Sequence, residues 1–432
     1  MYRRTQTGLF PVQCGVGIAN SFKGWCPMAS AFVFLVAAGA QAAPVDVYRG
    51  TLGGSAVVME LGKPGEDGER QGRYFYLRHG VDIPLRGSLN ALSEARPLNN
   101  DWARESGGEP PVLTDSQQRR IVWQLRQQGS ALAGEWVDDI HGKKLPLALT
   151  HIAQYDPEKI APFGVEAVTL AIVQGAGSGI ASGVAISAQA TPYDYLKVAE
   201  QKLEQGKEVV VSPTLAWRPV RDARTQFRYP RLTRHPDSKI LAQTNTVLEQ
   251  RHWGMSLEAL ACVGSIYQNA GPAAGSLGDF NNESIKVTYL SSALMSVVES
   301  GSTGCGGAHP NNHYDPFVLD LLKGGYMDFT RLLKDVKYGE YKLEYGDRLS
   351  RFLSKAVNRH SEDDKECTEL LPQYMALMLD KPDKMSFVIS GIGHAMGVCL
   401  GSGVSVPFKE LKPYIKPGAQ RYFQPGVPSG AI

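Results

Sequence analysis

The chain has 432 residues, of which 43% are hydrophobic and 20% are charged. A chain of this length normally forms two or three domains of roughly 150 residues each, and its composition is too apolar for a disordered protein. Its 45 Lys and Arg residues are balanced by 43 Asp and Glu residues. This balance gives no basic excess of the kind that indicates a nucleic-acid-binding protein.

Residues 1–43 predict a signal peptide. The apolar run from Met28 to Ala42 is shorter than the roughly 20 residues of a membrane-spanning helix. It ends in Ala40-Gln41-Ala42, which is typical of a cleavage site. We therefore expect a periplasmic or secreted protein that does not span the membrane after cleavage. The long basic region ahead of the run leaves the true start codon open.

Residues 44–155 predict an antiparallel β-meander of about eight strands, as a small barrel or an open sheet. Gly53-Gly54 lies between two alternating runs, which indicates a hairpin. A repeat supports this interpretation: segments starting at Gly72 and Gly134 both read Gly-x-aromatic, four residues, His-Gly, two residues, Ile or Leu, Pro, Leu. The repeat places His79 and His141 in turns, although a pair of ligands is the alternative.

Residues 156–192 predict a linker or irregular segment. Residues 193–418 then predict an α+β domain, and residues 419–432 a tail. A helix is expected from Thr191 to Gly206 and another after Asp237, because apolar residues recur there at helical spacing. From residue 283 onward the apolar pattern alternates with a period of two, as in strands, and short helical segments lie between the strands.

Four cysteines remain after the predicted cleavage: Cys262, Cys305, Cys367 and Cys399. An even number in an exported chain indicates two disulfides. The pairing nearest in sequence is Cys262 with Cys305 and Cys367 with Cys399, among three possible pairings.

Residues 304–316, GCGGAHPNNHYDP, are the strongest candidate site. His309, His313 and Asp315 supply the imidazole and carboxylate groups that zinc accepts, and either Asp320 or His394 would complete a shell. Glycine, proline and asparagine in the same stretch favour a turn instead. A third interpretation is a binding surface formed by His309, Asn311, His313 and Asp315. Cys305 would be a nucleophile only as a free thiolate, which pairing with Cys262 forbids.

Three segments resemble the RsiV-like extracytoplasmic domain, which also occurs in PdaC-type peptidoglycan deacetylases. They are residues 229–250, residues 294–325 with the Gly-Gly-Ala-His-Pro turn, and residues 404–415. The resemblance covers roughly residues 230–416. It implies a module that binds a ligand outside the cytoplasmic membrane, with lysozyme as one such ligand, and it implies no catalysis by this domain.

We therefore expect an exported, disulfide-bonded binding module of the bacterial cell envelope, without a cofactor. Its ligand would be lysozyme, another protein or a cell-wall glycan. An acidic run at residues 362–366 would suit a basic partner or form a solvated loop. The alternative function is a metal-dependent hydrolase that uses His309, His313 and Asp315.

Overall fold

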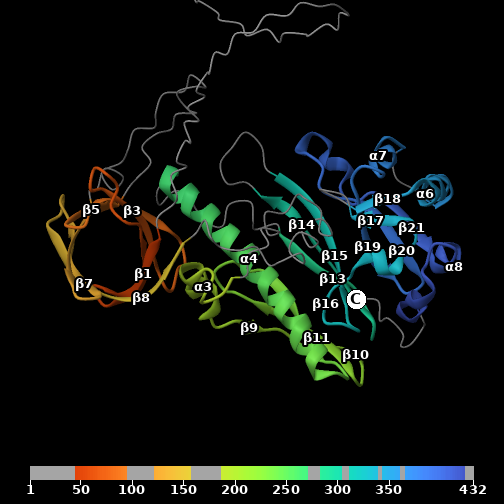
Figure 1. The fold of residues 1–432 in the computed structure, drawn as a ribbon, viewed down its shortest axis with the longest axis horizontal. Coiled ribbons are helices and arrows are strands. Elements are labelled where there is room, and N and C mark those ends of the chain that lie inside the picture. Colours follow the sequence, from red (N-terminus) through yellow and green to blue (C-terminus); the bar gives the residue numbers. More distant parts are fainter. Residues whose placement is uncertain are drawn as a thin grey trace, which may run out of the picture. The chain divides into compact units, whose positions relative to one another are not determined.

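The computed structural model describes residues 44–94, 121–156, 186–270, 283–303, 311–338, 343–360 and 365–423. They belong to one compact unit, Ala42–Ile432, so the predicted division at residues 156–192 stays a prediction. The predicted signal peptide, most of the predicted linker and the end of the predicted tail lie outside the described residues. The predicted class is confirmed: an antiparallel β-structure comes first, and sheets with a few helices follow (Figure 1).

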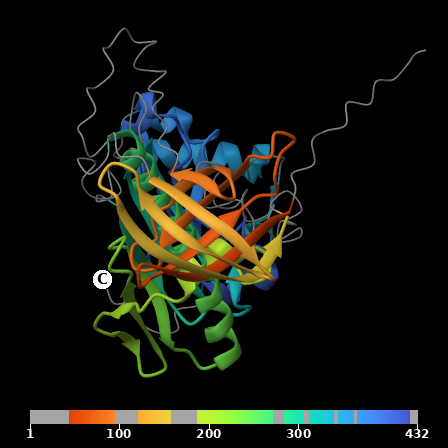
Figure 2. The ribbon, with the colours of Figure 1, turned by 90° about the vertical axis from the view of Figure 1, so that its left-hand side faces the viewer.

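The first eight strands pair in chain order and close into an antiparallel barrel, seen in red to yellow in Figure 2. They are β1 (Val45–Leu52), β2 (Ser55–Leu61), β3 (Arg70–Tyr76), β4 (Ile83–Ser88), β5 (Ala91–Glu94), β6 (Ile121–Gln128), β7 (Ala131–Asp138) and β8 (Lys143–Tyr155). Strands β1 and β8 close the barrel, with pairs from Val45–Tyr155 to Leu52–Leu147. The predicted meander is thus a barrel and not an open sheet, and closure removes the unpaired edges that an open sheet would expose.

Aromatic side chains fill the barrel around one carboxylate. Glu94 Oε1 accepts hydrogen bonds from the Tyr74 hydroxyl at 2.7 Å, Trp136 Nε1 at 3.0 Å and Trp123 Nε1 at 3.2 Å. These three aromatic residues are buried, whereas the neighbouring Tyr76 is only partly buried. Each polar aromatic atom therefore has a partner inside the barrel, which burial of Tyr and Trp requires.

The two copies of the sequence repeat form two hairpins with the same register. Gly72 pairs with Leu85 in β3–β4, and the equivalent Gly134 pairs with Leu147 in β7–β8. The glycines that follow His79 and His141 have φ values of +71° and +65°, a region that glycine enters without steric cost. The His141 imidazole lies 3.0 Å from the Asp138 carboxylate within its own turn. The two histidines are therefore turn residues, as the repeat predicts.

The predicted helix from Thr191 is shorter than expected. Helix α3 (Pro192–Ala199) has proline in its first turn, but it ends well before Gly206. Residues 204–205 instead form β9, which pairs with β11. Strands β9 and β11 belong to a four-stranded sheet that follows the barrel. Its strands are β9 (Glu204–Gln205), β10 (Val209–Ser212), β11 (Leu215–Arg221) and β12 (Arg228–Arg234). Strand pairing has overridden the helical propensity of residues 200–206.

The long helix α4 (Ser238–Ala270) begins where predicted, because the Asp237 carboxylate accepts hydrogen bonds from the backbone N–H groups of Lys239 and Ile240. Its apolar side chains pack on a sheet of β13 (Ser284–Leu290), β14 (Leu294–Thr303), β15 (Asn311–Asp320) and β16 (Gly325–Tyr326). The opposite face of this sheet packs on a second sheet, where Val298 and Tyr314 meet Met378 and Val388.

The second sheet contains β19 (Met375–Lys381), β20 (Lys384–Ile389) and β21 (Gly403–Pro407). The remaining elements cover it or connect its strands: α5 (Phe329–Leu332), β17 (Val336–Tyr338), β18 (Leu343–Tyr345), α6 (Asp347–His360), α7 (Lys365–Leu370), η4 (His394–Cys399), α8 (Phe408–Leu411) and η5 (Pro417–Tyr422). Within the described residues, no helix has the length and apolar character needed to cross a bilayer.

Candidate functional site

A charged cluster lies at one end of the sheet face that α4 covers. Alternate residues of a strand share one face, so His313 and Asp315 lie beside Phe317 in β15. In β14, Glu299 pairs with Asp315, and the next same-face pair is Val297 with Phe317. The face is therefore apolar along most of its length and becomes charged toward residues 299–303 and 311–315.

His313 is held between two carboxylates. Its Nδ1 lies 3.0 Å from Asp315 Oδ2, and its Nε2 lies 2.7 Å and 2.9 Å from the two oxygens of Glu283. The imidazole is 14% exposed, and the two carboxylates are 2% and 1% exposed. Burial opposes the imidazolium, but the hydrogen bonds and charges of Asp315 and Glu283 outweigh it and raise the pKa of His313 to about 10. The imidazole is therefore protonated at neutral pH, with both nitrogens donating.

Gly301 makes this arrangement possible. It pairs with His313 in the neighbouring strand, and the Glu283 carboxylate passes over it to reach the imidazole. A Cβ atom at position 301 would lie 2.4 Å from Glu283 Oε1, which is too close for a normal contact. The absence of a side chain at position 301 thus leaves the space that the Glu283 carboxylate occupies.

Asp315 is also bound from the second sheet. The Ser390 hydroxyl, directly after β20, donates to Asp315 Oδ1 at 3.0 Å. The hydroxyl donates to the carboxylate and not to His313, so the three residues do not form a nucleophile–base pair of the serine-hydrolase kind. This hydrogen bond ties the charged end of β15 to the second sheet.

A second ion pair lies next along the same face. Arg251 of α4 binds Glu299 through two hydrogen bonds, one of them at 2.8 Å from Nε, and the Tyr229 hydroxyl donates to the same carboxylate. The guanidinium lies 4.0 Å from the centre of the Phe317 ring. Both charged groups are buried, and a bidentate pair with further donors is the geometry that makes such burial tolerable.

Glu258 of α4 adds a further carboxylate to the cluster. Burial and the negative charges of Glu299, Glu283 and Asp315 outweigh the positive charge of His313 and raise the pKa of Glu258 to about 7. The cluster therefore combines four carboxylates with one imidazolium and one guanidinium. The negative charges of the cluster outnumber its positive charges, and protonation of Glu258 reduces that difference by one.

The surroundings of His313 are poorly suited to the alternative interpretation, in which His313 is a metal ligand. A metal ligand or general base needs a free imidazole nitrogen, and in His313 both nitrogens donate to carboxylates. Among the described residues, no group of three or more His, Cys, Asp or Glu side chains is arranged to hold a metal ion. His309, the other predicted imidazole ligand, lies outside the described residues.

The other predicted site residues are separated. Asn311 begins β15, directly opposite Thr303. Asp320 lies at the other end of the strand, where its carboxylate accepts hydrogen bonds from the Leu322 backbone and the Tyr422 hydroxyl. His394 begins η4, in the turn that follows the second sheet's central strand. Among the described side chains of the predicted shell, the structure therefore brings His313 and Asp315 together.

Sequence reasoning missed the partners of His313. Met295, Val297 and Glu299 are alternate residues of one strand, and the first two are apolar core residues. A charged residue at the third position was therefore a detectable signal for a buried ion pair. Glu283 offered no comparable signal, because it precedes the strand and reaches His313 over 30 residues of sequence. Glu258 lies in an ordinary helical pattern.

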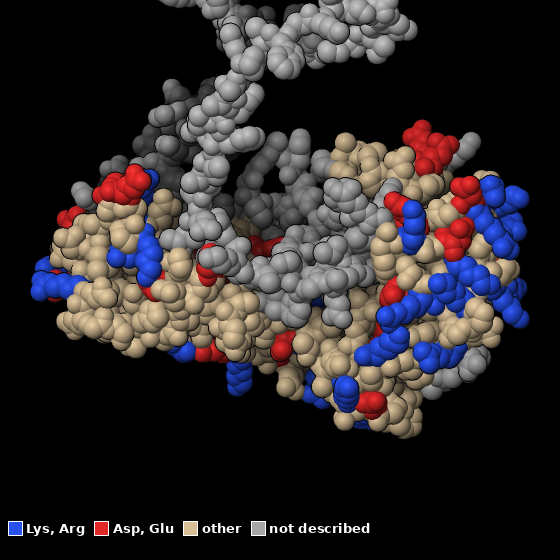
Figure 3. All heavy atoms as spheres, in the orientation of Figure 1, with Lys and Arg blue, Asp and Glu red and all other residues tan. Residues whose placement is uncertain are grey.

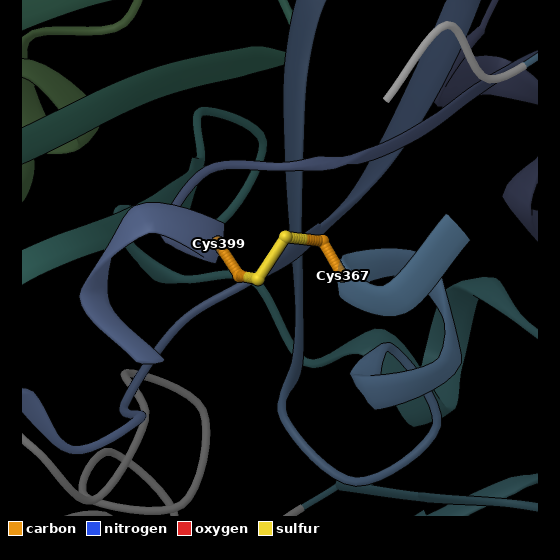
Figure 4. Close-up of a disulfide and its surroundings, with 2 residues drawn as sticks. All are labelled: Cys367 and Cys399. Carbon is orange, nitrogen blue, oxygen red and sulfur yellow. A yellow bond between two sulfur atoms is a disulfide. The ribbon is translucent and has the colours of Figure 1, made fainter. Parts of the chain in front are cut away.

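One predicted disulfide is confirmed. Cys367 of α7 is bonded to Cys399 at the end of η4, with their Cα atoms 5.1 Å apart (Figure 4). Cys262 is also disulfide-bonded, which excludes a free thiol there. Its predicted partner Cys305 lies outside the described residues, as do Glu362, Asp363 and Asp364 of the acidic run.

Two grooves of the described surface lie away from His313, on the barrel. One, of about 310 Å³, is lined by residues that include Ser55, Tyr76, Arg78 and Gln201. The other, of about 580 Å³, lies beside the β4–β5 hairpin. Comparison with known proteins identifies no family: no family model matches the chain, and no curated protein matches it.

Proposed function

We propose that the protein is an exported, non-catalytic binding module of the bacterial cell envelope, and that η4 provides contacts to a protein ligand. The main support for the proposal is the triad of Glu283, His313 and Asp315. Its ion pairs give the residues of the candidate site a structural role and not a catalytic one. The triad links Glu283, directly before β13, to His313 and Asp315 in β15. The resemblance of residues 230–416 to the RsiV-like domain points to the same kind of function.

The η4 turn exposes apolar side chains on a rigid frame. Val398 is 89% exposed and Met396 is 37% exposed. The disulfide at Cys399 anchors the turn, and Gly397 lies so close to Asn312 of β15 that a Cβ atom would be 3.1 Å from its side-chain nitrogen. Because the exposed apolar side chains are already held rigidly, little conformational entropy is lost when a partner covers them.

The ligand we favour is a protein, because the cores of protein–protein interfaces are apolar. Lysozyme is the first protein to test, since the resemblance implies it. A cell-wall glycan is the alternative ligand, and the groove beside Tyr76 on the barrel would be its place, because aromatic side chains stack on sugar rings.

The test is binding of the exported protein to lysozyme and to soluble peptidoglycan fragments, measured by calorimetry. We expect Val398→Asp to weaken binding of a protein ligand at least roughly tenfold, because a carboxylate would be buried without a partner. Ile140→Asp is the matched control, since Ile140 is a 55% exposed residue in a barrel turn.

Two results would remove the proposal. Unchanged lysozyme affinity in Val398→Asp would exclude η4 as the contact, and absence of binding to both ligands at millimolar concentration would exclude both. The hydrolase alternative is tested separately by metal analysis of protein purified without chelator. One bound zinc or manganese per chain, lost in His313→Ala, would favour the hydrolase.

A further inference from the structure

Positive charge gathers on one face of the C-terminal part of the chain, shown in blue in Figure 3. We define the α6–α8 surface by eight exposed cations from α6, from α8 with the segment after it, and from the segment that follows α5: Arg348, Arg351, Lys355, Arg359, Lys409, Lys412, Lys416 and Lys334. The two segments 347–360 and 408–416 contain only two acidic residues, Asp347 and Glu410. The surface is therefore strongly basic, although the chain as a whole is nearly neutral.

Helical geometry aligns the four arginine and lysine residues of α6. At 100° per residue, positions 348, 351, 355 and 359 fall within about 80° of the helix circumference, over about 16 Å of its length. Leu349, Leu353 and Ala356, on another face of the helix, are buried in the core. The burial of that face therefore holds the basic stripe in solvent.

Contacts place the second group of cations beside the stripe. Arg348 lies 5.5 Å from the centre of the Tyr414 ring, and Phe352 packs on the same ring at 4.7 Å. The Lys334 ammonium donates to the Pro413 carbonyl, next to Lys412. The cations thus spread over two dimensions, and not along a single line.

Most of these charges are not neutralised by the described residues. Arg359 pairs with Glu410 at 3.1 Å, but no described carboxylate forms an ion pair with Arg351, Lys355, Lys409, Lys412 or Lys416. Cations this close together raise the local potential and attract an anionic surface. A cationic protein such as lysozyme would be repelled by this surface, so it would have to bind elsewhere.

We propose that the α6–α8 surface binds the phosphate headgroups of an anionic phospholipid bilayer. A two-dimensional array of cations matches a plane of headgroups better than a single polymer strand, and each Lys or Arg near such a plane contributes to binding. None of the exposed large apolar side chains of the described residues belongs to α6 or α8. The contact is therefore electrostatic, at the level of the headgroups, without insertion into the hydrocarbon. Its occurrence in the cell rests on the proposed export, but the binding itself does not.

The test is co-sedimentation of the exported, processed protein with vesicles of phosphatidylcholine that contain about 30% phosphatidylglycerol, at low and near-physiological salt. We expect binding that decreases as salt rises and that is absent from pure phosphatidylcholine. The fourfold variant Arg351→Glu, Lys355→Glu, Lys412→Glu and Lys416→Glu should bind at least roughly tenfold more weakly. Circular dichroism checks that the variant is folded, as the exposure of all four side chains predicts.

The control reverses two exposed cations of the barrel, Arg126→Glu and Lys143→Glu, and is compared with the paired variant Lys412→Glu and Lys416→Glu. An equal loss of vesicle binding in the two paired variants would overturn the proposal, because the total charge of the protein and not this surface would then determine binding. Binding to pure phosphatidylcholine, or no vesicle binding at low salt, would also overturn it. Binding to soluble polyphosphate without vesicle binding would overturn it in favour of a linear polyanion. None of these outcomes depends on binding through Val398, so this proposal and the proposed function fail separately.

Discussion

At the scale of single residues, charge pairing decides what His313 does. The histidine has the right neighbours in sequence for a metal site, but Glu283 and Asp315 occupy both of its nitrogens. Because its pKa is raised in the folded protein, the stability it contributes is complete below the ordinary histidine pKa of about 6.5. That contribution is lost as pH rises through about 10.

Substitution of Gly301 tests the triad without changing any of its charged residues. We expect Gly301→Ala to displace the Glu283 carboxylate, because the new Cβ atom would lie 2.4 Å from its oxygen. The pKa of His313 should then fall, and the protein should lose about 1–3 kcal/mol of stability with a charged hydrogen bond. NMR titration of the imidazole measures the first effect, and urea unfolding measures the second.

Gly325→Ala is the control for this experiment, since a Cβ atom there meets nothing within 4 Å. An unchanged His313 titration in Gly301→Ala would show that Glu283 does not depend on the open space at position 301.

At the scale of elements, the repeat shows what sequence similarity preserves. The hairpins β3–β4 and β7–β8 have the same strand register and the same positive φ at the turn glycine. Their surroundings differ, however. A Cβ atom at Gly80 would lie 2.5 Å from the Arg224 guanidinium and 3.1 Å from Leu260, whereas one at Gly142 would meet nothing within 4 Å. The repeat therefore copies local geometry and not tertiary contacts.

This difference predicts unequal effects of the same substitution. Gly142→Ala should destabilise the protein by about 1–2 kcal/mol, the cost of a left-handed conformation for alanine. Gly80→Ala should cost about 1 kcal/mol more, because its side chain must also displace neighbours. Chemical denaturation of the two variants measures both values. Equal losses would contradict the close packing around Gly80, and the Gly142 variant itself is the control for backbone strain.

At the scale of the whole molecule, the buried carboxylates make stability depend on pH. The pKa of Glu258 is raised from 4.5 in the unfolded chain to about 7 in the folded protein. Between these values the folded state holds the proton more strongly than the unfolded state. The contribution of Glu258 to stability should therefore fall as pH rises from about 4.5 to about 7, and it should change no further above that range.

Glu258→Gln should remove this dependence. Glutamine resembles the protonated acid, so the variant should match the wild type near pH 4.5 and exceed its stability by about 1–3 kcal/mol at pH 8. Urea unfolding at the two pH values gives the comparison. Glu249→Gln on the same helix is the control. A variant as sensitive to pH as the wild type would assign the dependence to other groups.

The local parts of this structure were predictable from sequence. Alternating runs between Gly53-Gly54, His79-Gly80 and His141-Gly142 predict hairpins, because side-chain alternation and positive φ are properties of neighbouring residues. The capping of α4 by Asp237 is local in the same sense, and so is the register of the repeat. The disulfide of Cys367 with Cys399 was predictable from its short separation along the chain.

Only the tertiary structure decided the remaining features. Barrel closure requires β1 to meet β8 about a hundred residues later, and residues 204–205 joined a sheet because β11 was available to pair with them. His313 became an imidazolium held by two carboxylates because Glu283 reaches it across a strand that has glycine at the crossing point. Residue type alone carries no information about such distant partners, and it is the partner that sets the charge and the accessibility of an ionisable side chain.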